Sequence, residues 1–423
     1  MNETYYPRLR ETLHRTTLPC GLRVRTVYKP DFAKFYAILL VNCGSVDRRY
    51  ARDGQLVQMP QGVAHYLEHK LFDMPEGSAD ALFAAIGASG NAYTAHDFTG
   101  YYVQSSEQQA EALRVLLRMA FTPYFTEETV QKERGIITQE IKMAADDPYD
   151  CLGEIHMQSL FPGHPLSEPI LGTEESIAGI TPDCLRRWYS DFYRPENMVL
   201  CVEGNLPPAE VAAIASELLP PAQAGRVDSL FDRTPAAPPR TGAQYLRREV
   251  SMPTFRLSFP LPDRPPEDQR FEFAAELALE LLAGDSADCF RQLYESGLVD
   301  SGFTWSIERY RRKAFLSFGG DSRDPEAVCA ALCAAARTML SGGVRSDDLA
   351  RLKRSMLGRL LRDLDSFSVC CTRLAECTLC GQDYFRFPEI LDAITEAELA
   401  PLLRAIVPEQ AVLTILAPKE EAL

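Results

Sequence analysis

Alternating apolar and polar positions mark short strands in the first half of the chain, and stretches with a period near 3.6 mark helices between them. Leu22, Val24 and Thr26 alternate after a turn at residues 19–21, which predicts a hairpin over residues 16–28. Further strands are predicted at 35–43, 99–105 and 198–203, and helices at 79–88, 107–119, 127–143, 151–160 and 181–192. This alternation predicts an α+β fold.

The same order of elements returns in the second half. The predicted strands are 255–259 and 313–318, and the helices are 271–282, 325–340 and 348–364. Ile180 and Ile394, 214 positions apart, each introduce a last helix and a closing strand. A repeat of this length indicates a duplicated domain. We predict two homologous α/β-sandwich domains, residues 1–218 and 242–423, joined by a linker over residues 219–241 that is rich in Pro and Ala.

The composition is that of a soluble globular protein, with 46% apolar and 24% charged residues. A net charge of −15 argues against a nucleic-acid partner, which would require a basic patch. The first residues show no export signal, and the apolar stretch at 35–41 is far too short for a bilayer. We therefore expect a cytoplasmic protein with no membrane partner, whose 12 cysteines, including Cys377-x-x-Cys380, are reduced residues of the core.

The candidate chemistry lies in His65-Tyr66-Leu67-Glu68-His69. Residues three and four apart share one face of a helix, so His65, Glu68 and His69 would point the same way. Zinc favours neutral imidazole ligands, and a catalytic zinc site uses three protein ligands and a water of lowered pKa. Glu68 could take the proton of that water. This order of residues, His-x-x-Glu-His, is the inverzincin signature.

A third metal ligand is expected on a later helix. Glu133 and Glu140 are the candidates, because they lie seven residues apart, about two helical turns, and so share a face. From the spacing alone, either glutamate could reach the metal.

Four segments together resemble the insulinase or pitrilysin-type zinc metallopeptidases, in the half-length branch that includes mitochondrial processing peptidase. They are Gly62 to Lys70, Asn91 to Thr94 with Thr99 and Tyr101, Glu133 to Glu140, and Tyr193 to Met198. The likeness is greatest to bacterial insulinase-like proteins associated with 5-aminopentanol modification of a translation elongation factor, which occur beside a sister protein that lacks the zinc motif.

The resemblance implies one zinc ion per chain, with His65, His69 and Glu140 as ligands. It implies that Glu68 is the general base and that Glu133 orients the site. In this family an extended peptide adds to a sheet edge, so the resemblance also implies that substrate contacts Asn91, Ala92 and Thr94.

We therefore expect a zinc-dependent metalloendopeptidase that hydrolyses peptides or unfolded polypeptides. One departure from the family pattern concerns residues 294–303, where catalytic members often carry an Arg and a Tyr that stabilise the oxyanion. The arginine position holds Ser296, and Arg309-Tyr310 lies out of register. A homologous partner chain could supply these groups in a homodimer or heterodimer. The alternative is a non-proteolytic or partner-dependent subunit that retains the zinc site.

Overall fold

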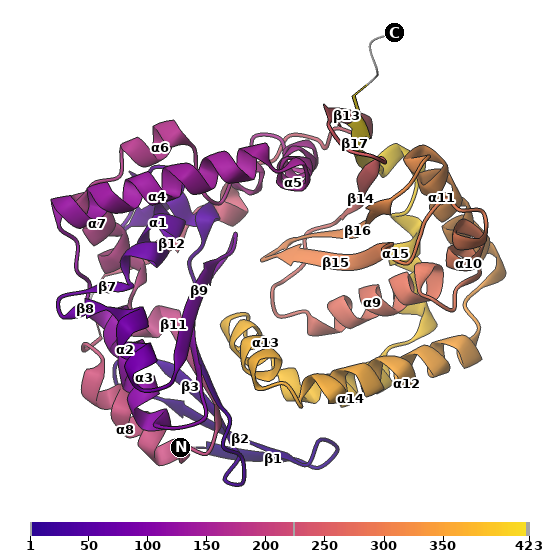
Figure 1. Ribbon diagram of the computed structural model, residues 1–423. Helices are drawn as coiled ribbons and strands as arrows, with labels where there is room; N and C mark the ends of the chain where they lie inside the picture. Colours follow the sequence, from indigo (N-terminus) through magenta and orange to yellow (C-terminus); the bar gives the residue numbers. More distant parts are fainter. Residues whose placement is uncertain (1, 223–224, 420–423) are drawn as a thin grey trace. The chain divides into compact units, whose positions relative to one another are not determined.

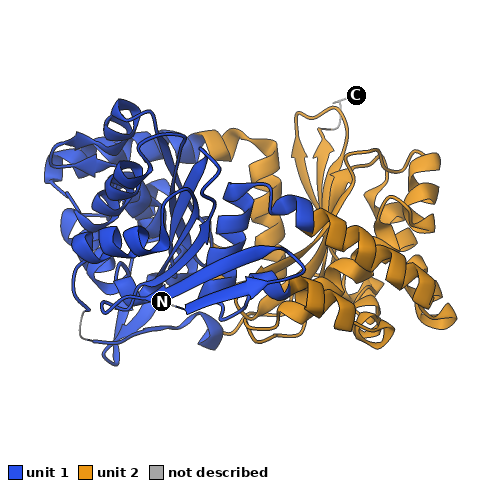
Figure 2. Ribbon diagram, turned by 90° about the horizontal axis from the view of Figure 1, so that it is seen from below, with its two compact units in different colours: residues 1–142, 169–234, 361–386 blue, residues 143–168, 235–360, 387–423 orange. Residues whose placement is uncertain are grey.

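Two units make up the chain, and neither is a continuous stretch of sequence (Figure 2). The computed structural model describes residues 2–222 and 225–419. Unit 1 comprises residues 1–142, 169–234 and 361–386, and unit 2 comprises residues 143–168, 235–360 and 387–423. Each unit has its own mixed sheet with helices against it, so each is described by itself.

Unit 1 is built on a sheet of seven strands in the described part of the chain (Figure 1). In sheet order they are β1 (Asn2–Tyr6), β2 (Glu11–Thr17), β3 (Arg23–Tyr28), β11 (Met198–Gly204), β4 (Phe35–Val41), β10 (Thr99–Ser105) and β9 (Ser89–Thr94). Every residue of β4 and β11 is buried, as expected for central strands with both faces covered. The edge strand β9 pairs with β10, and its other side carries no strand of the described chain.

Helices cover both faces of this sheet. The main apolar core of unit 1 lies on one face, and its helices are α1 (Val63–Lys70), α2 (Ala79–Ala85), α3 (Gln109–Phe121), α4 (Glu127–Asp146), α6 (Glu174–Ala178), α7 (Pro182–Phe192) and α8 (Pro208–Leu218). The helix α13 (Phe367–Leu379) packs on β4 and β11. Two small sheets complete the unit, β12 (Val227–Ser229) with β5 (Arg49–Arg52) and β6 (Gln55–Gln58), and β7 (Asp73–Met74) with β8 (Gly77–Ser78).

Unit 2 repeats this sheet with fewer strands. Its order is β13 (Gly242–Arg248), β17 (Val412–Pro418), β14 (Thr254–Leu261), β16 (Lys313–Asp321) and β15 (Thr304–Tyr310). The first two strands run parallel and the rest antiparallel, as do β3, β11, β4, β10 and β9 in unit 1. The helices are α5 (Pro148–Leu160), α9 (Gln269–Ala283), α10 (Asp288–Glu295), α11 (Pro325–Gly342), α12 (Ser346–Asp363), α14 (Phe387–Ala393) and α15 (Glu396–Arg404). The predicted fold class, a duplicated α+β domain, is confirmed.

The two domains predicted on either side of residues 219–241 do not coincide with these units. Residues 143–168, predicted in the first domain, lie in unit 2, and residues 361–386, predicted in the second, lie in unit 1. Long-range packing is the reason: on α5 the buried His156 hydrogen-bonds to Thr414 at 2.9 Å and to Ser258 at 2.8 Å, both on strands of unit 2.

The predicted linker also contains structure. The strand β12 lies within residues 219–241 and pairs with β5, and residues up to 234 belong to unit 1. Residues 223–224 of this segment lie outside the described residues. As to membranes, none of the helices in the described ranges is both long and apolar enough to cross a bilayer.

Candidate metal centre

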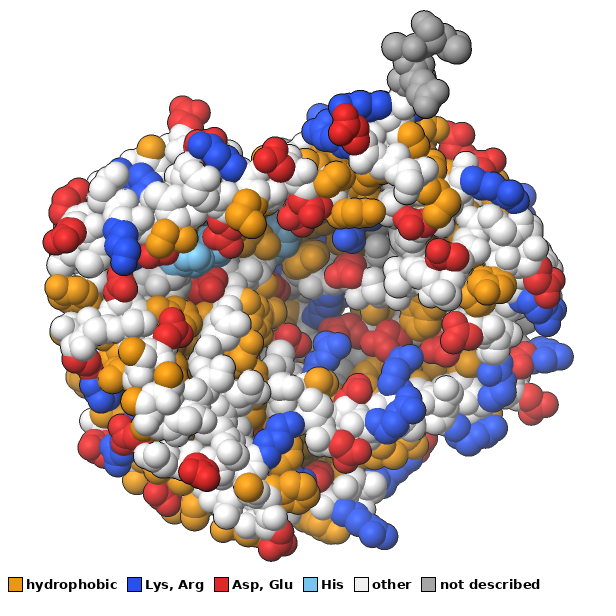
Figure 3. All heavy atoms as spheres, in the orientation of Figure 1, with side chains coloured by type: hydrophobic (Ala, Val, Ile, Leu, Met, Phe, Trp, Pro, Cys, Tyr) orange, Lys and Arg blue, Asp and Glu red, His pale blue; other side chains and the backbone are white. Residues whose placement is uncertain are grey.

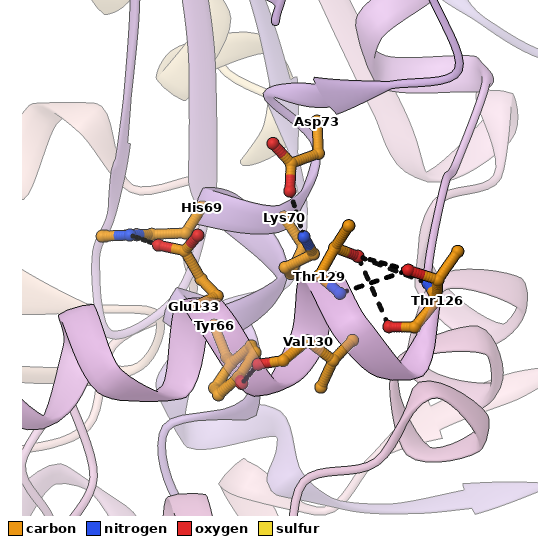
Figure 4. A network of polar contacts seen from close by, with 8 residues as sticks. All are labelled: Tyr66, His69, Lys70, Asp73, Thr126, Thr129, Val130 and Glu133. Atoms are coloured by element: carbon orange, nitrogen blue, oxygen red, sulfur yellow. Dashed lines mark hydrogen bonds and ion pairs between the residues drawn. The ribbon is translucent and has the colours of Figure 1, made fainter. Parts of the chain in front are cut away.

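The helix α1 begins at a glycine for a steric reason. Gly62 has φ +82°, and a Cβ atom there would come within 2.4 Å of the carbonyl oxygen of Leu171. The helix then buries Tyr66, whose hydroxyl donates a hydrogen bond to the carbonyl of Val130 on α4 (Figure 4). This buried contact fixes α1 against α4, so that the polar side chains of the two helices can meet.

Two histidines and one glutamate converge between these helices. Oε2 of Glu140 lies 3.7 Å from Nε2 of His65 and 3.6 Å from Nε2 of His69. The possible ligand atoms of the three residues all lie within 4.8 Å of one another. In the space-filling view, histidine side chains near α1 and α4 border acidic side chains at the surface (Figure 3).

Glu133 holds one of these histidines in place. Its Oε1 lies 2.9 Å from Nδ1 of His69 (Figure 4), which leaves Nε2 of His69 directed at Glu140. Burial lowers the pKa of His69, but the hydrogen bond that its Nδ1 donates to Glu133 and the charges of Glu68 and Glu140 outweigh burial, so the pKa is raised. Spacing alone did not decide which glutamate could be the third metal ligand. In the structure Glu140 faces both imidazoles, whereas Glu133 contacts His69 on the opposite side of its ring.

Glu68 has a partner that the sequence did not indicate. The side chain is 8% exposed, and its Oε2 accepts a hydrogen bond of 2.6 Å from the hydroxyl of Thr94 on β9. Burial raises the pKa of Glu68, and the Thr94 hydrogen bond opposes that rise. Thr94 was predicted as a substrate contact; the structure places its hydroxyl on the candidate base.

The residues present fit a zinc ion. Oε2 of Glu140, which faces the Nε2 atoms of His65 and His69, is buried without a hydrogen-bond partner among the described residues. Burial, together with the neighbouring His69, lowers the pKa of His65 to about 3, so the imidazole is neutral, the form that binds metals. Two imidazoles and one carboxylate are a known ligand set of catalytic zinc sites.

The other predicted substrate contacts lie on the same strand as Thr94. Asn91 and Ala92 precede it on β9, and the exposed Asn91 accepts a hydrogen bond of 2.8 Å from the backbone N–H of Ala92. β9 is an edge strand of the sheet, the position at which an extended peptide can add to a sheet. The structure thus brings an open sheet edge and the candidate base together through Thr94.

The corresponding helices of unit 2 carry a different polar group. On α9, Glu276 and Glu280 have the same four-residue spacing as His65 and His69. Arg359 on α12 lies 3.0 Å from Oε2 of Glu276 and 3.3 Å from Oε2 of Glu280. An ion-paired guanidinium therefore connects these two helices.

Arg309, the arginine that lies out of register with the family pattern, already has hydrogen-bond partners within unit 2. Arg309 on β15 pairs with Glu272 and donates to the carbonyl of Pro265 at 2.9 Å, both in unit 2. Ser296, at the position where the resemblance expects an arginine, directly follows α10.

Two family models match most of the chain. Residues 23–174 match the insulinase model (peptidase family M16), and residues 179–356 match the model of the peptidase M16 inactive domain. Among curated proteins, the chain is 29% identical over 406 residues to the uncharacterized zinc protease YmfH of Bacillus subtilis, covering 92% of each chain.

Solved structures agree with this match. A putative M16-like peptidase from Alicyclobacillus acidocaldarius is 26% identical, with a TM-score of 0.92 over 97% of this chain and 99% of that one. A protease from Helicobacter pylori is 17% identical, with a TM-score of 0.81 over 96% of this chain and 99% of that one, and shares the fold.

Proposed function

Because the chain is built from the two domains of the insulinase family, peptidase family M16, we propose that it is a zinc-dependent endopeptidase acting on peptides or unfolded polypeptides. The observation that carries this proposal is the convergence of His65, His69 and Glu140 on one point beside the buried carboxylate of Glu68. The name of the relative YmfH, an uncharacterized zinc protease, supports the same chemistry.

We assign the chain's residues as follows. His65, His69 and Glu140 would hold zinc, which when bound supplies a Lewis acid that polarises a carbonyl and acidifies water. Glu133 keeps Nε2 of His69 directed at the site through its contact with Nδ1. Oε2 of Glu68 accepts the Thr94 hydrogen bond, so Oε1 would take the proton from the attacking water and deliver it to the leaving amine.

The proposed substrate is an extended peptide. Strand addition to β9 would pair its backbone with the edge that carries Asn91 and Ala92, next to Thr94 and Glu68. Backbone pairing selects an extended conformation more than a particular sequence, which suits short or unfolded polypeptides. Cleavage inside a folded domain would require that segment to unfold first.

A partner-dependent subunit is the second candidate function. The observation that favours it is that Arg309 is bound to Glu272 and to a backbone carbonyl while Ser296 stands at the expected arginine position. In that case a homologous partner chain would supply the missing oxyanion donor. A role beside the modification of a translation elongation factor is part of this second proposal and is supported by sequence resemblance alone.

The test is metal content together with hydrolysis of a mixed peptide library by the purified chain. We expect one zinc per chain, lost in His65→Ala, and turnover that is lost in Glu68→Gln while zinc is retained. Zinc without turnover by the chain alone, restored when a homologous partner is added, would favour the second candidate. Turnover that survives both substitutions would refute the peptidase site.

A further inference from the structure

A polar cavity lies in unit 1, away from the candidate metal centre. It has a volume of about 350 Å³, opens to solvent, and is lined by β1, β2 and β3 together with α13 and the segment after it. Three arginines line it, Arg15, Arg23 and Arg25, with Asp383 as the carboxylate in the lining. The volume lies within the range of pockets that bind small ligands.

The strand register forces these arginines together. Arg15 on β2 lies directly opposite Arg25 on β3, and Arg23 is two residues from Arg25 on the same face of that strand. Like charges in directly opposite positions destabilise a sheet unless something compensates them. Burial lowers the pKa of Arg25, and the charges of Arg15 and Arg23 lower it further, whereas the charge of Asp383 opposes this.

The one carboxylate in the lining, Asp383, already has partners in the chain. Asp383 lies 3.0 Å from the guanidinium of Arg15 and accepts hydrogen bonds of 3.0 and 2.8 Å from the hydroxyl of Tyr6. Arg23 donates to the carbonyl of Thr378, and Arg25 donates to the carbonyl of its own neighbour on β3. Within residues 2–222 and 225–419, no acidic side chain forms an ion pair with Arg23 or Arg25.

A chain with a net charge of −15 thus keeps in one cavity two partly buried guanidinium groups that form no ion pair with an acidic side chain in the described ranges. Each guanidinium has five N–H donors in a planar fork that matches oxyanions. We propose that this cavity binds a small, multiply charged oxyanion, held mainly by Arg23 and Arg25. Phosphate esters and polycarboxylates share this chemistry. Because α13 forms one wall, the bound anion would connect this helix to the sheet of unit 1.

The test is isothermal titration calorimetry of the full chain with pyrophosphate and, separately, with citrate, at ionic strength held constant with sodium chloride. We expect saturable binding with one site per chain. Arg25→Gln and Arg23→Gln should each weaken it about ten- to a hundredfold, the effect of losing a hydrogen bond to a charged group. Stronger binding of pyrophosphate would identify a phosphorylated ligand, and stronger binding of citrate a polycarboxylate.

The matched control is Arg10→Gln. Arg10 is exposed in the turn between β1 and β2, outside the cavity lining, so this substitution changes the net charge equally. The proposal is supported if Arg10→Gln keeps the affinity for the anion and both cavity variants weaken it. Anion binding that survives Arg23→Gln and Arg25→Gln, as binding at the metal centre would, overturns it. The proposal is also overturned if neither pyrophosphate nor citrate binds saturably. Thermal unfolding establishes that each variant is folded before titration.

Discussion

Thr94 offers the sharpest test of how the candidate site works, because the sequence and the structure give it different roles. The resemblance implies a contact with substrate. In the structure its hydroxyl donates a 2.6 Å hydrogen bond to Oε2 of Glu68, a carboxylate that is 8% exposed. Thr94→Val removes the hydroxyl and keeps the branched shape that suits a strand, whereas Thr94→Ser keeps the hydroxyl.

The size of the effect follows from that hydrogen bond. A hydrogen bond to a charged group contributes about 1.5–3 kcal/mol, and each 1.36 kcal/mol of activation free energy changes a rate about tenfold. If Thr94 holds Glu68 in the position from which it takes a proton, Thr94→Val should lower kcat by about 10- to 150-fold. KM should change little, since the backbone of β9 still offers its edge to the peptide.

The assay is the initial rate of cleavage of a fluorogenic peptide over a range of concentrations, with zinc content measured on the same samples. Thr94→Ser should retain most of the kcat of the parent chain, and all three proteins should bind zinc equally. If Thr94→Val instead raises KM and leaves kcat unchanged, Thr94 acts on the substrate, and the proposed positioning of Glu68 is refuted.

Three further predictions concern the metal and stability. Glu133→Ala should weaken zinc binding by roughly ten- to a hundredfold because His69 loses its Nδ1 partner; chelator competition measures this, and the exposed Glu128→Ala on the same helix should leave affinity unchanged. Burial raises the pKa of Glu203 from 4.5 to about 7, so its folded form holds the proton more tightly and stability falls as pH rises between these values. In urea titrations Glu203→Gln should therefore raise the free energy of unfolding by up to about 3 kcal/mol at pH 8 and little at pH 4.5, and an equal gain at both would contradict this. Arg359→Leu should lower the free energy of unfolding by about 1 kcal/mol in the same assay, since the two α9 glutamates it contacts then repel each other; no loss would mean that the ion pairs contribute nothing.

Local features of the sequence predicted much of the fold. The strand predicted at residues 99–105 is β10, with the same bounds. The hairpin predicted over residues 16–28 is the antiparallel pair of β2 and β3, although β2 begins at residue 11, before the predicted start. The placing of His65, Glu68 and His69 on one helix also follows from helical periodicity, which is a local property. Spacing alone left Glu133 and Glu140 open as the third ligand. The family resemblance pointed to Glu140, and the packing of α1 on α4 places Glu140 opposite both imidazoles.

Contacts between distant segments explain what the sequence did not predict. Nothing near Thr94 in the sequence indicates that its hydroxyl meets Glu68, because the contact depends on where β9 passes α1. The exchange of α5 and α13 between the units is of the same kind. A domain boundary drawn at a proline-rich stretch assumes that each half packs on itself, whereas α5 packs on β14 and β17, far along the chain.

The two units differ in the polar groups that connect their corresponding helices. In unit 1, the Nε2 atoms of two imidazoles face Oε2 of Glu140, which is buried without a hydrogen-bond partner among the described residues. In unit 2, two carboxylates face Arg359, so the cation is part of the chain and the ion pairs are complete. The same pair of helices thus meets through candidate metal ligands in one unit and through ion pairs in the other. The ion-paired guanidinium of unit 2 keeps the contact between the two helices without the His-His-Glu group, so the contact between these helices does not depend on the candidate metal ligands.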